Sequence, residues 1–186
     1  MLLFVGLGNP TPDSENNRHN VGFKIIDAIN KKFSLSKQKP KFKGLLTTGN
    51  IKDEKVYAIK PLTFMNNSGI CIRELLEYFK FDAEDVIVFH DDLDIEFGKI
   101  KAKFGGSSAG HNGITSIDKF IGKDYSRVRI GIGKPKTQIS SYDYVLQNFD
   151  EDELVGIDKI SKNIIDSIED LIQKKLDLFS STVNNK

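Results

Sequence analysis

Two kinds of apolar pattern alternate along the chain, and together they predict an α/β fold. Residues 2–7 and 86–89 are short apolar runs without polar alternation, which is typical of strands covered on both faces. A loop rich in polar residues follows the first run. Apolar residues at helical spacing come next and predict a helix that begins near His19 or Asn20 and ends near Phe33.

The next part of the chain predicts a hairpin and a second helix. Residues 44–52 and 55–60 are strand-like and flank a polar turn at Lys52-Asp53-Glu54-Lys55. Pro61 ends the second strand, and residues 63–69 form a loop with two amides beside an aromatic residue. A helix is expected after this loop because apolar residues recur at helical spacing, namely Ile72, Leu75, Leu76 and Phe79.

Residues 98–104 and 125–132 alternate between basic and apolar positions, which predicts two half-buried strands. In the first, the lysines fall on one face, while Ile100, Ala102 and Phe104 fall on the other. In the second, Arg127 and Arg129 share a face. If the two strands lie side by side, their basic faces meet and can hold a phosphate.

The segment between these strands, residues 105–113, is rich in glycine and serine. It is either a flexible connector or a loop that faces an anion, and its position before a short helix at 114–121 favours the second interpretation. Residues 151–176 predict one long amphipathic helix, and Ser180 to Lys186 are expected to fray. There is no internal repeat, so residues 1–186 are expected to form a single domain.

Composition narrows the class of protein. A chain of 186 residues with 39% apolar and 28% charged residues is typical of a soluble globular domain. No apolar run is long enough to span a membrane, and the N-terminus lacks the basic region of a signal peptide. Cys71 is the only cysteine, which excludes an internal disulfide and fits a cytoplasmic location. It lies in an apolar helical pattern, so we expect a buried residue rather than a nucleophile.

The net charge of +1 hides an uneven distribution of charge. Nine basic residues lie between Lys99 and Lys136, opposed only by Asp118 and Asp124, whereas acids predominate between Asp150 and Asp177. A second run of lysines lies between residues 31 and 43, and we interpret that run as ordinary solvated surface. The first distribution can build a positive face on a nearly neutral protein.

The loops of the predicted fold carry the side chains that can do chemistry. A histidine that acts as a general base needs a partner to fix its tautomer, and Asp91 or Asp92 could serve His19 in this way. Amide side chains at Asn66 and Asn112 can hold a substrate or a developing oxyanion. No serine stands in a nucleophile-elbow setting, which leaves water as the nucleophile and indicates a hydrolase.

Three alternatives are weaker. His19, His90, His111 and Asp91 could form a hydrolytic zinc site, but they lack the close spacing of known zinc motifs. Gly6-x-Gly8 suggests a dinucleotide site, but Pro10 and Thr11 do not fit that fingerprint. A non-catalytic RNA-binding protein would need only the basic face. That interpretation does not explain why His19, Asp91 and three asparagines, Asn9, Asn66 and Asn112, are present in the loops.

These motifs, taken together and in order, resemble bacterial peptidyl-tRNA hydrolase over nearly the whole chain. The resemblance rests on Gly6-Leu7-Gly8-Asn9-Pro10, Arg18-His19-Asn20-Val21-Gly22, Pro61 to Gly69, His90-Asp91-Asp92-Leu93-Asp94, Gly110-His111-Asn112-Gly113 and Arg127 to Gly133. It implies a monomeric α/β protein with a mixed twisted sheet flanked by helices. It also implies hydrolysis of the ester between a peptide and the 3′-terminal ribose of tRNA, without a metal or other cofactor, in the service of translation.

The resemblance further implies a role for each matching residue. His19 matches the base that activates water, Asp91 the residue that orients it, and Asn9 the amide that distinguishes a blocked peptidyl group from a free aminoacyl group. The substrate-binding residues implied in the same way are Phe64, Met65, Asn66 and Asn112 around the tRNA end, and Lys103 and Arg129 at its 5′ phosphate.

Two residues depart from the family pattern. Ser14 stands where the family usually has a tyrosine that contacts the tRNA end; a serine can form hydrogen bonds there but cannot stack. Ala109 replaces a glycine in the loop before His111, which is expected to stiffen that loop slightly.

Overall fold

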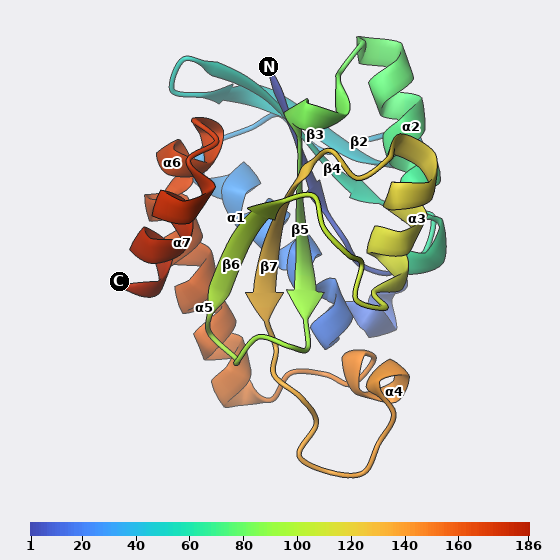
Figure 1. Cartoon of the computed structure of the whole chain (residues 1–186). Coiled ribbons are helices and arrows are strands. Elements are labelled where there is room, and N and C mark those ends of the chain that lie inside the picture. Colours follow the sequence, from blue (N-terminus) through green and yellow to red (C-terminus); the bar gives the residue numbers. More distant parts are fainter.

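The computed structural model describes all residues, 1–186, and contains a seven-stranded sheet with helices on both faces (Figure 1). The order of the strands is β2-β3-β4-β1-β5-β7-β6. Their bounds are Leu2–Gly6 (β1), Lys39–Lys41 (β2), Gly44–Ile51 (β3), Glu54–Pro61 (β4), Val86–Asp92 (β5), Ile100–Phe104 (β6) and Ser126–Gly131 (β7).

The sheet is mixed, as the resemblance implied. β1 lies in the middle, parallel to β4 and β5, and β7 continues the parallel set beside β5. β3 and β6 run antiparallel to their neighbours β4 and β7. The carboxyl ends of the four parallel strands therefore meet at one edge, which is where ligands bind in sheets of this type.

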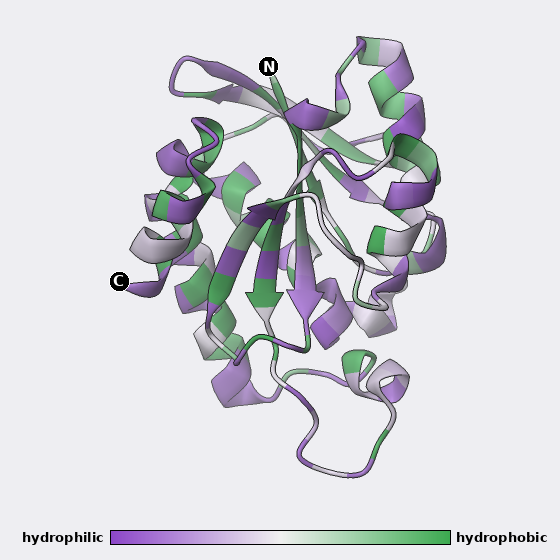
Figure 2. Cartoon of the chain, viewed as in Figure 1, coloured by the Kyte–Doolittle hydropathy of each residue, from purple (hydrophilic) through white to green (hydrophobic).

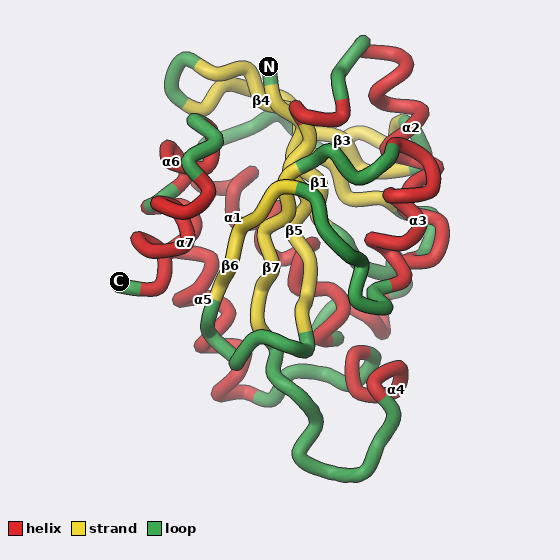
Figure 3. The backbone as a smooth tube through the Cα atoms, in the orientation of Figure 1, coloured by secondary structure: helices red, strands yellow, loops and turns green.

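The helices form two layers, which the backbone trace of Figure 3 separates clearly. α2 and α3 lie on one face of the sheet, and α1, α5, α6 and α7 lie on the other (Figure 1). The bounds are Val21–Lys32 (α1), Ser68–Phe79 (α2), Asn112–Ile121 (α3), Ser141–Val145 (α4), Glu151–Asp166 (α5), Ile168–Ile172 (α6) and Leu176–Asn184 (α7). Short 3₁₀ turns precede α1 at Arg18–Asn20 and α2 at Met65–Asn67.

The alternation of side chains along each strand separates two hydrophobic cores. In β1, Phe4 belongs to the core under α1 and α5 to α7, whereas Leu3 and Val5 belong to the core under α2 and α3. All five residues of β1 are buried, as expected for a strand covered on both faces. Figure 2 shows the hydrophobic positions on the strands and on the sides of the helices that face them.

A close approach of backbone to backbone fixes the first helix against the first strand. A Cβ atom added to Gly6 would lie 2.3 Å from the carbonyl oxygen of Gly22 on α1. Only glycine fits such a contact, and this explains the glycine at position 6, near the end of the first apolar run. The contact holds the start of α1, and with it the preceding turn that carries His19, at the carboxyl end of β1.

The predicted hairpin, the first three helices and the strands at 98–104 and 125–132 are present, and these two strands are paired. The predictions for the C-terminal part were partly wrong. Residues 151–176 are not one helix, because the chain leaves helical geometry at Ser167 (φ −109°, ψ 10°) between α5 and α6. The apolar spacing continues through this junction, so the pattern alone could not reveal it.

The C-terminal residues are not frayed. α7 continues to Asn184, and Phe179 and Val183 are buried in the core. The helix also completes the edge of the sheet: the Asn184 amide bonds the backbone N–H and C=O of Ile100, and the Ser180 hydroxyl accepts from the N–H of Ala102. α7 thus satisfies an edge strand whose backbone groups would otherwise face solvent.

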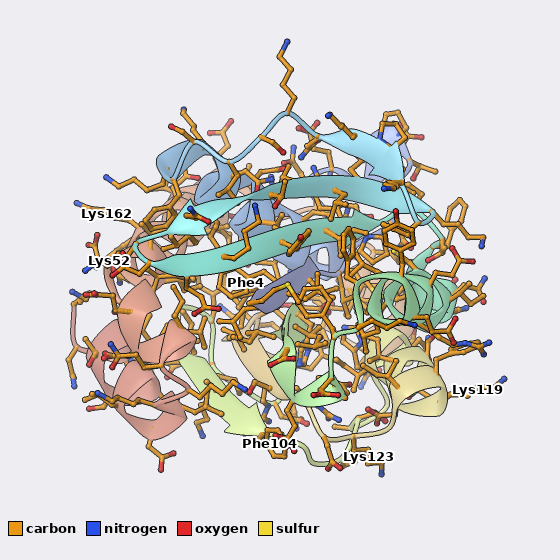
Figure 4. The ribbon with its side chains drawn as sticks, turned by 90° about the horizontal axis from the view of Figure 1, so that it is seen from above. Phe4, Lys52, Phe104, Lys119, Lys123 and Lys162 are labelled. Atoms are coloured by element: carbon orange, nitrogen blue, oxygen red, sulfur yellow. The ribbon has the colours of Figure 1, made fainter.

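Two smaller differences concern single positions. Phe104 was predicted to face the core, but its side chain is exposed at the periphery of the molecule (Figure 4), because α7 bonds β6 only as far as Ala102. Within the run of lysines between residues 31 and 43, residues 39–41 form the short, exposed edge strand β2, which the sequence pattern did not indicate. None of the helices has the length and apolar character that crossing a membrane requires.

Candidate active site

His19 and Asp91 come together at the carboxyl edge of the sheet. His19 lies on the turn before α1, and Asp91 lies near the end of β5, which extends beyond the predicted run to Asp92. The Nδ1–H of His19 donates to Asp91 Oδ2 at 2.8 Å, and both side chains are buried. This hydrogen bond fixes the tautomer of His19 and leaves Nε2 with a free lone pair.

The charge of Asp91 tunes His19 as a base. Burial lowers the pKa of His19, but the negative charge of Asp91 and its hydrogen bond outweigh this effect, so the pKa lies above its usual value of 6.5. For Asp91, burial raises the pKa, and the charges of His19 and His111 reverse that effect and hold it well below its usual range. Asp91 is therefore ionised at neutral pH.

His111 is a second partner of Asp91 that the sequence did not single out for this purpose. Its Nδ1 accepts the backbone N–H groups of Gly113 and Ile114 and caps the N-terminus of α3. The proton of the ring must then lie on Nε2, which donates to Asp91 Oδ1 at 2.8 Å. The helix cap thus fixes the tautomer of His111, and His111 in turn fixes the carboxylate of Asp91.

His90 lies behind this group. Its Nδ1–H donates to the carbonyl oxygen of Asp91, and its ring packs edge-on against His111 with the centroids 5.0 Å apart. The pKa of His90 is lowered to about 3, mainly by burial and secondly by electrostatic repulsion from the nearby His111. His90 is therefore neutral and acts as part of the support for Asp91, which excludes it as a base.

Asn9 is held at the other side of His19 by two sets of bonds. The side chain of Asn20 bonds both the backbone N–H and the backbone C=O of Asn9, as a neighbouring strand would. The Oδ1 atom of Asn9 accepts the N–H of Met65 at 2.9 Å. This bond fixes the orientation of the amide, so its Nδ2 group, which has no partner within the chain, is free to donate to a ligand.

A cavity of about 860 Å³ opens above these groups and has the size of a site for a small ligand. Besides Asn9, His19 and Asp91, its walls include the predicted residues Ser14, Phe64, Met65, Asn66 and Asn112. Asn66 and Asn112 are exposed, so their amides are available to a ligand. The loops therefore gather eight of the ten predicted site residues around one cavity.

Phe64 has an unusual backbone, with φ 60° and ψ 158°, in a region that residues other than glycine rarely adopt. The bond between Asn9 and the N–H of Met65 holds the next peptide in place. As a result the Phe64 ring stands 54% exposed on the wall of the cavity. Strain of this kind is typical of residues that a site positions for a ligand.

Lys103 and Arg129, the other two predicted residues, lie on the neighbouring pair of strands. β6 and β7 pair Lys101 with Arg129 and Lys103 with Arg127, so the basic faces do meet. Partial burial and the nearby charges of Arg129 and Arg127 lower the pKa of Lys103, which is the effect expected where cations are crowded. Asp92 does not bind His19; it accepts from Nε of Arg129 at 2.9 Å.

Arg127 is not available to a ligand, although it shares the face with Arg129. It is 1% exposed and donates to Asp118 and to the carbonyl oxygen of Ser107. It therefore ties the loop at 105–111 to β7 and fixes the approach to His111.

His19, Asp91 and His111 are also the only group whose ligand atoms lie close enough to hold a metal ion, within 4.8 Å of one another. In the observed arrangement the two imidazoles donate protons to the carboxylate, and a metal would have to displace both protons. His90, the fourth residue considered from the sequence, is turned to a backbone carbonyl instead.

Of the functional residues, Asn20 and His111 were missed as site residues although their motifs were noted. A signal existed for Asn20, since an amide next to a candidate base in a loop often bonds a neighbouring loop. For His111 the decisive contact is with a residue 20 positions earlier, which only the packing of α3 beside β5 brings near.

The chain matches known proteins along its whole length. The model of a family described as peptidyl-tRNA hydrolase matches residues 3–186. A peptidyl-tRNA hydrolase of Pelagibacter ubique (strain HTCC1062) is 82% identical over 186 residues and covers 100% of both chains. One from Geobacillus kaustophilus (strain HTA426) is 45% identical over 93% of this chain and 94% of its own. The crystal structure of peptidyl-tRNA hydrolase from Acinetobacter baumannii superposes with a TM-score of 0.91 at 32% identity, covering 99% of this chain and 94% of that one.

Proposed function

The chain belongs to the peptidyl-tRNA hydrolase family, and we propose that it cleaves the peptidyl ester of tRNA by a single displacement with water activated by His19. The observation that carries this proposal is the hydrogen-bonded His19–Asp91–His111 group on the wall of a cavity that three amides also line. The group leaves one basic nitrogen, Nε2 of His19, without a partner.

The geometry favours water over a covalent nucleophile. The only hydrogen-bond partner of the His19 side chain within the chain is Asp91. No hydroxyl or thiol group is bonded to it. Ser14 lines the cavity, but its hydroxyl is paired with that of Thr11 at 2.7 Å. Burial, together with the nearby charge of Glu74, raises the pKa of the Cys71 thiol to about 12, so Cys71 cannot supply a thiolate.

The reaction then follows from the positions of the groups. Nε2 of His19 takes a proton from water as the water oxygen bonds to the ester carbonyl carbon, and Asp91 stabilises the imidazolium that forms. The carbonyl oxygen becomes an oxyanion, which the amide N–H groups of Asn66 and Asn112 can stabilise. The bond to the ribose 3′ oxygen breaks, and this oxygen receives the proton from His19.

Asn9 supplies the discrimination between blocked and free amino groups. Because its oxygen is held by Met65, Asn9 presents Nδ2–H donors, which suit the carbonyl of a peptide or acyl group. A free α-amino group is a cationic donor, and it would leave these N–H groups unpaired. Asn20 bonds the backbone of Asn9 and so fixes the position of the Asn9 amide that recognises the substrate.

The tRNA part of the substrate is assigned to the basic strands. Lys103 and Arg129 lie on the same face of the β6–β7 pair, and the carboxylate of Asp92 pairs with Arg129 only. A phosphate bridging them would relieve the crowding that lowers the pKa of Lys103. We further propose that the protein acts as a monomer in the cytoplasm and returns tRNA to translation.

The testing experiment measures release of an N-acetylated amino acid from tRNA by the wild type and by His19→Ala. We expect the variant to retain less than about 1% of kcat, because removal of a general base costs about 10²–10⁴-fold. The same assay with the free aminoacyl-tRNA should give a much smaller kcat/KM. Full activity of His19→Ala would contradict the mechanism.

Two arms of the assay separate the alternatives. A non-catalytic RNA-binding protein would bind the acylated tRNA without releasing the amino acid. A metal hydrolase built on His19, Asp91 and His111 would lose activity with a chelator and regain it with zinc. We expect turnover that a chelator does not change.

A further inference from the structure

An exposed tyrosine stands on the wall of the active-site cavity without a use in the proposed mechanism. Tyr142 is 65% exposed, lies on α4 and lines the same cavity as His19. Phe64, the other strongly exposed aromatic residue of this cavity, comes from the loop between β4 and α2. An exposed aromatic ring on a cavity wall offers a flat face on which a planar ligand group can stack.

The short helix that carries Tyr142 is firmly attached. Ser140 caps it by accepting the N–H of Asp143, and the neighbouring Tyr144 is buried and donates its hydroxyl proton to the carbonyl oxygen of Ile132. The guanidinium of Arg18 lies 4.3 Å from the centre of the Tyr144 ring. Since Arg18 directly precedes His19, α4 is tied to the segment that carries the base.

Further hydrogen bonds join the segment before His19 to the residues that follow α4. Arg18 donates to the carbonyl oxygen of Asn148 and pairs with Glu153 at 2.9 Å, and Asn17 bonds the side chain of Asn148. The backbone of residues 16–18 also bonds that of residues 147–149. Tyr142 is therefore presented by an element whose position relative to His19 is fixed, which is the requirement for a residue that orients a substrate.

The chemistry of the substrate specifies what such a ring would meet. The ester is attached to the ribose of the terminal nucleotide, and the base of that nucleotide is attached to the same ribose. When the ester lies at His19, the base is therefore within reach of the walls of the same cavity, which include Tyr142. Base and aromatic ring stack favourably, and this nucleoside is the constant part of the substrate whereas the peptide varies.

Ser14 cannot supply this stacking. It is buried, and its hydroxyl is already paired with Thr11. We propose that the ring of Tyr142 is a stacking surface for the nucleobase of the terminal nucleotide and positions the ester at His19. This inference rests on the proposed function, and it concerns binding of the nucleoside rather than the chemical step.

The test compares two ligands that differ only in the base. Both are stable analogues in which an N-acetylated amino acid is joined by an amide to the 3′ position of a ribose; one ribose carries adenine and the other carries hydrogen. Binding is measured by calorimetry for the wild type, Tyr142→Ala and Tyr142→Phe. Tyr78→Ala is the matched control, because Tyr78 is similarly exposed (62%) but does not line the cavity.

We expect Tyr142→Ala to weaken the adenine analogue about tenfold, the usual scale for loss of one stacked base, and to leave the analogue without a base unchanged. Tyr142→Phe and Tyr78→Ala should bind both analogues as the wild type does. Unchanged affinity of Tyr142→Ala for the adenine analogue would overturn the inference. Equal weakening of both analogues would also overturn it, because the effect would then come from a change in the cavity.

Hydrolysis by the wild type is measured in parallel on N-acetylated aminoacyl-tRNA. If the wild type releases the amino acid but Tyr142→Ala binds the adenine analogue normally, only the stacking inference fails. If the wild type releases none, the proposed function fails, and the binding comparison no longer bears on a substrate.

Discussion

The Nδ1–H of His19 donates to a carboxylate oxygen of Asp91 at 2.8 Å, across 72 positions of sequence. The bond joins the first loop of the chain to the end of β5, the strand beside the central β1, and it is buried from solvent. A buried carboxylate in this position orients the imidazole and makes it more basic. The catalytic expectations for this protein depend on that single contact.

Asp91→Asn should slow the reaction and change its pH dependence. His19 must be neutral to act as a base, and Asp91 raises its pKa, so activity of the wild type should fall as the pH drops through a value above 6.5. In the variant the negative charge is absent, so the loss of activity at low pH should move to a lower pH. In addition, kcat should fall about 10²–10⁴-fold because the tautomer of His19 is no longer fixed. Profiles of kcat/KM against pH test both effects. An unchanged acid limb would exclude Asp91 as the cause of the raised pKa.

His111 should affect stability and turnover separately. Its Nδ1 caps α3, and its Nε2–H holds Asp91. His111→Ala should lose about 1 kcal/mol of unfolding free energy through the cap and about tenfold in kcat through the charged hydrogen bond. His111→Asn can still cap a helix but is too short to replace the imidazole at Asp91. It should therefore recover the stability, measured by urea unfolding, without recovering kcat; recovery of both would mean that His111 acts only as a cap.

Asn9→Asp should weaken the discrimination between substrates. The variant keeps an oxygen for the N–H of Met65, but it replaces the Nδ2–H donors by a second oxygen. The kcat/KM for N-acetylated aminoacyl-tRNA should fall about 10²-fold, the scale for loss of a positioned donor. The value for free aminoacyl-tRNA should rise, because the new carboxylate can accept from the cationic α-amino group. A proportional loss on both substrates would count against a role for Asn9 in discrimination.

Lys103→Ala and Arg129→Ala should weaken tRNA substrates while sparing short ones. Each removes a cation from the shared face of β6 and β7, and each should reduce the slope of log kcat/KM against log salt by about one. A 3′ ester of adenosine with an N-acetylated amino acid lacks the distant phosphate and should react at the wild-type rate. Lys159→Ala, at an exposed position of α5, is the matched control. Equal losses on tRNA and on the short ester would show that Lys103 and Arg129 do not act by binding a distant phosphate of tRNA.

The sequence was sufficient where a pattern depends on local geometry. Apolar runs and helical spacing located the strands, the first helices and the loops at the carboxyl edge, because a buried strand and an amphipathic helix each impose a period on the sequence. Since parallel strands end at one edge, Asn9, Asn66 and Asp91 could be expected near one another. Their assignment to specific roles came from the resemblance rather than from the pattern.

The sequence was not sufficient where the outcome depends on what covers a surface. Arg127 and Arg129 alternate identically on β7, yet the loop at 105–111 and Asp118 bury the first and leave the second accessible. Alternation assigns a residue to a face but does not say which element lies over that face. For the same reason the contact of His111 with Asp91 could not be read from the sequence.

The C-terminal tail gives the clearest example of this limit, and it leads to a test of stability. Its serines and asparagines looked like those of a frayed end, but Asn184 bonds both backbone groups of Ile100 on the edge strand β6. Asn184→Ala should lower the unfolding free energy by about 1–3 kcal/mol, because two backbone groups lose their partners. Asn185→Ala, at the exposed neighbouring position, is the matched control and should have little effect.

The same variant separates stability from catalysis. Ile100 and Asn184 lie outside the cavity, so kcat of Asn184→Ala at a temperature where the protein is folded should equal that of the wild type. Amide hydrogen exchange at Ile100 should become faster, because its N–H then has no acceptor within the chain. If exchange at Ile100 and the unfolding free energy both stayed at wild-type values, α7 would contribute only its apolar face, through Phe179 and Val183, and the edge of β6 would be satisfied by water.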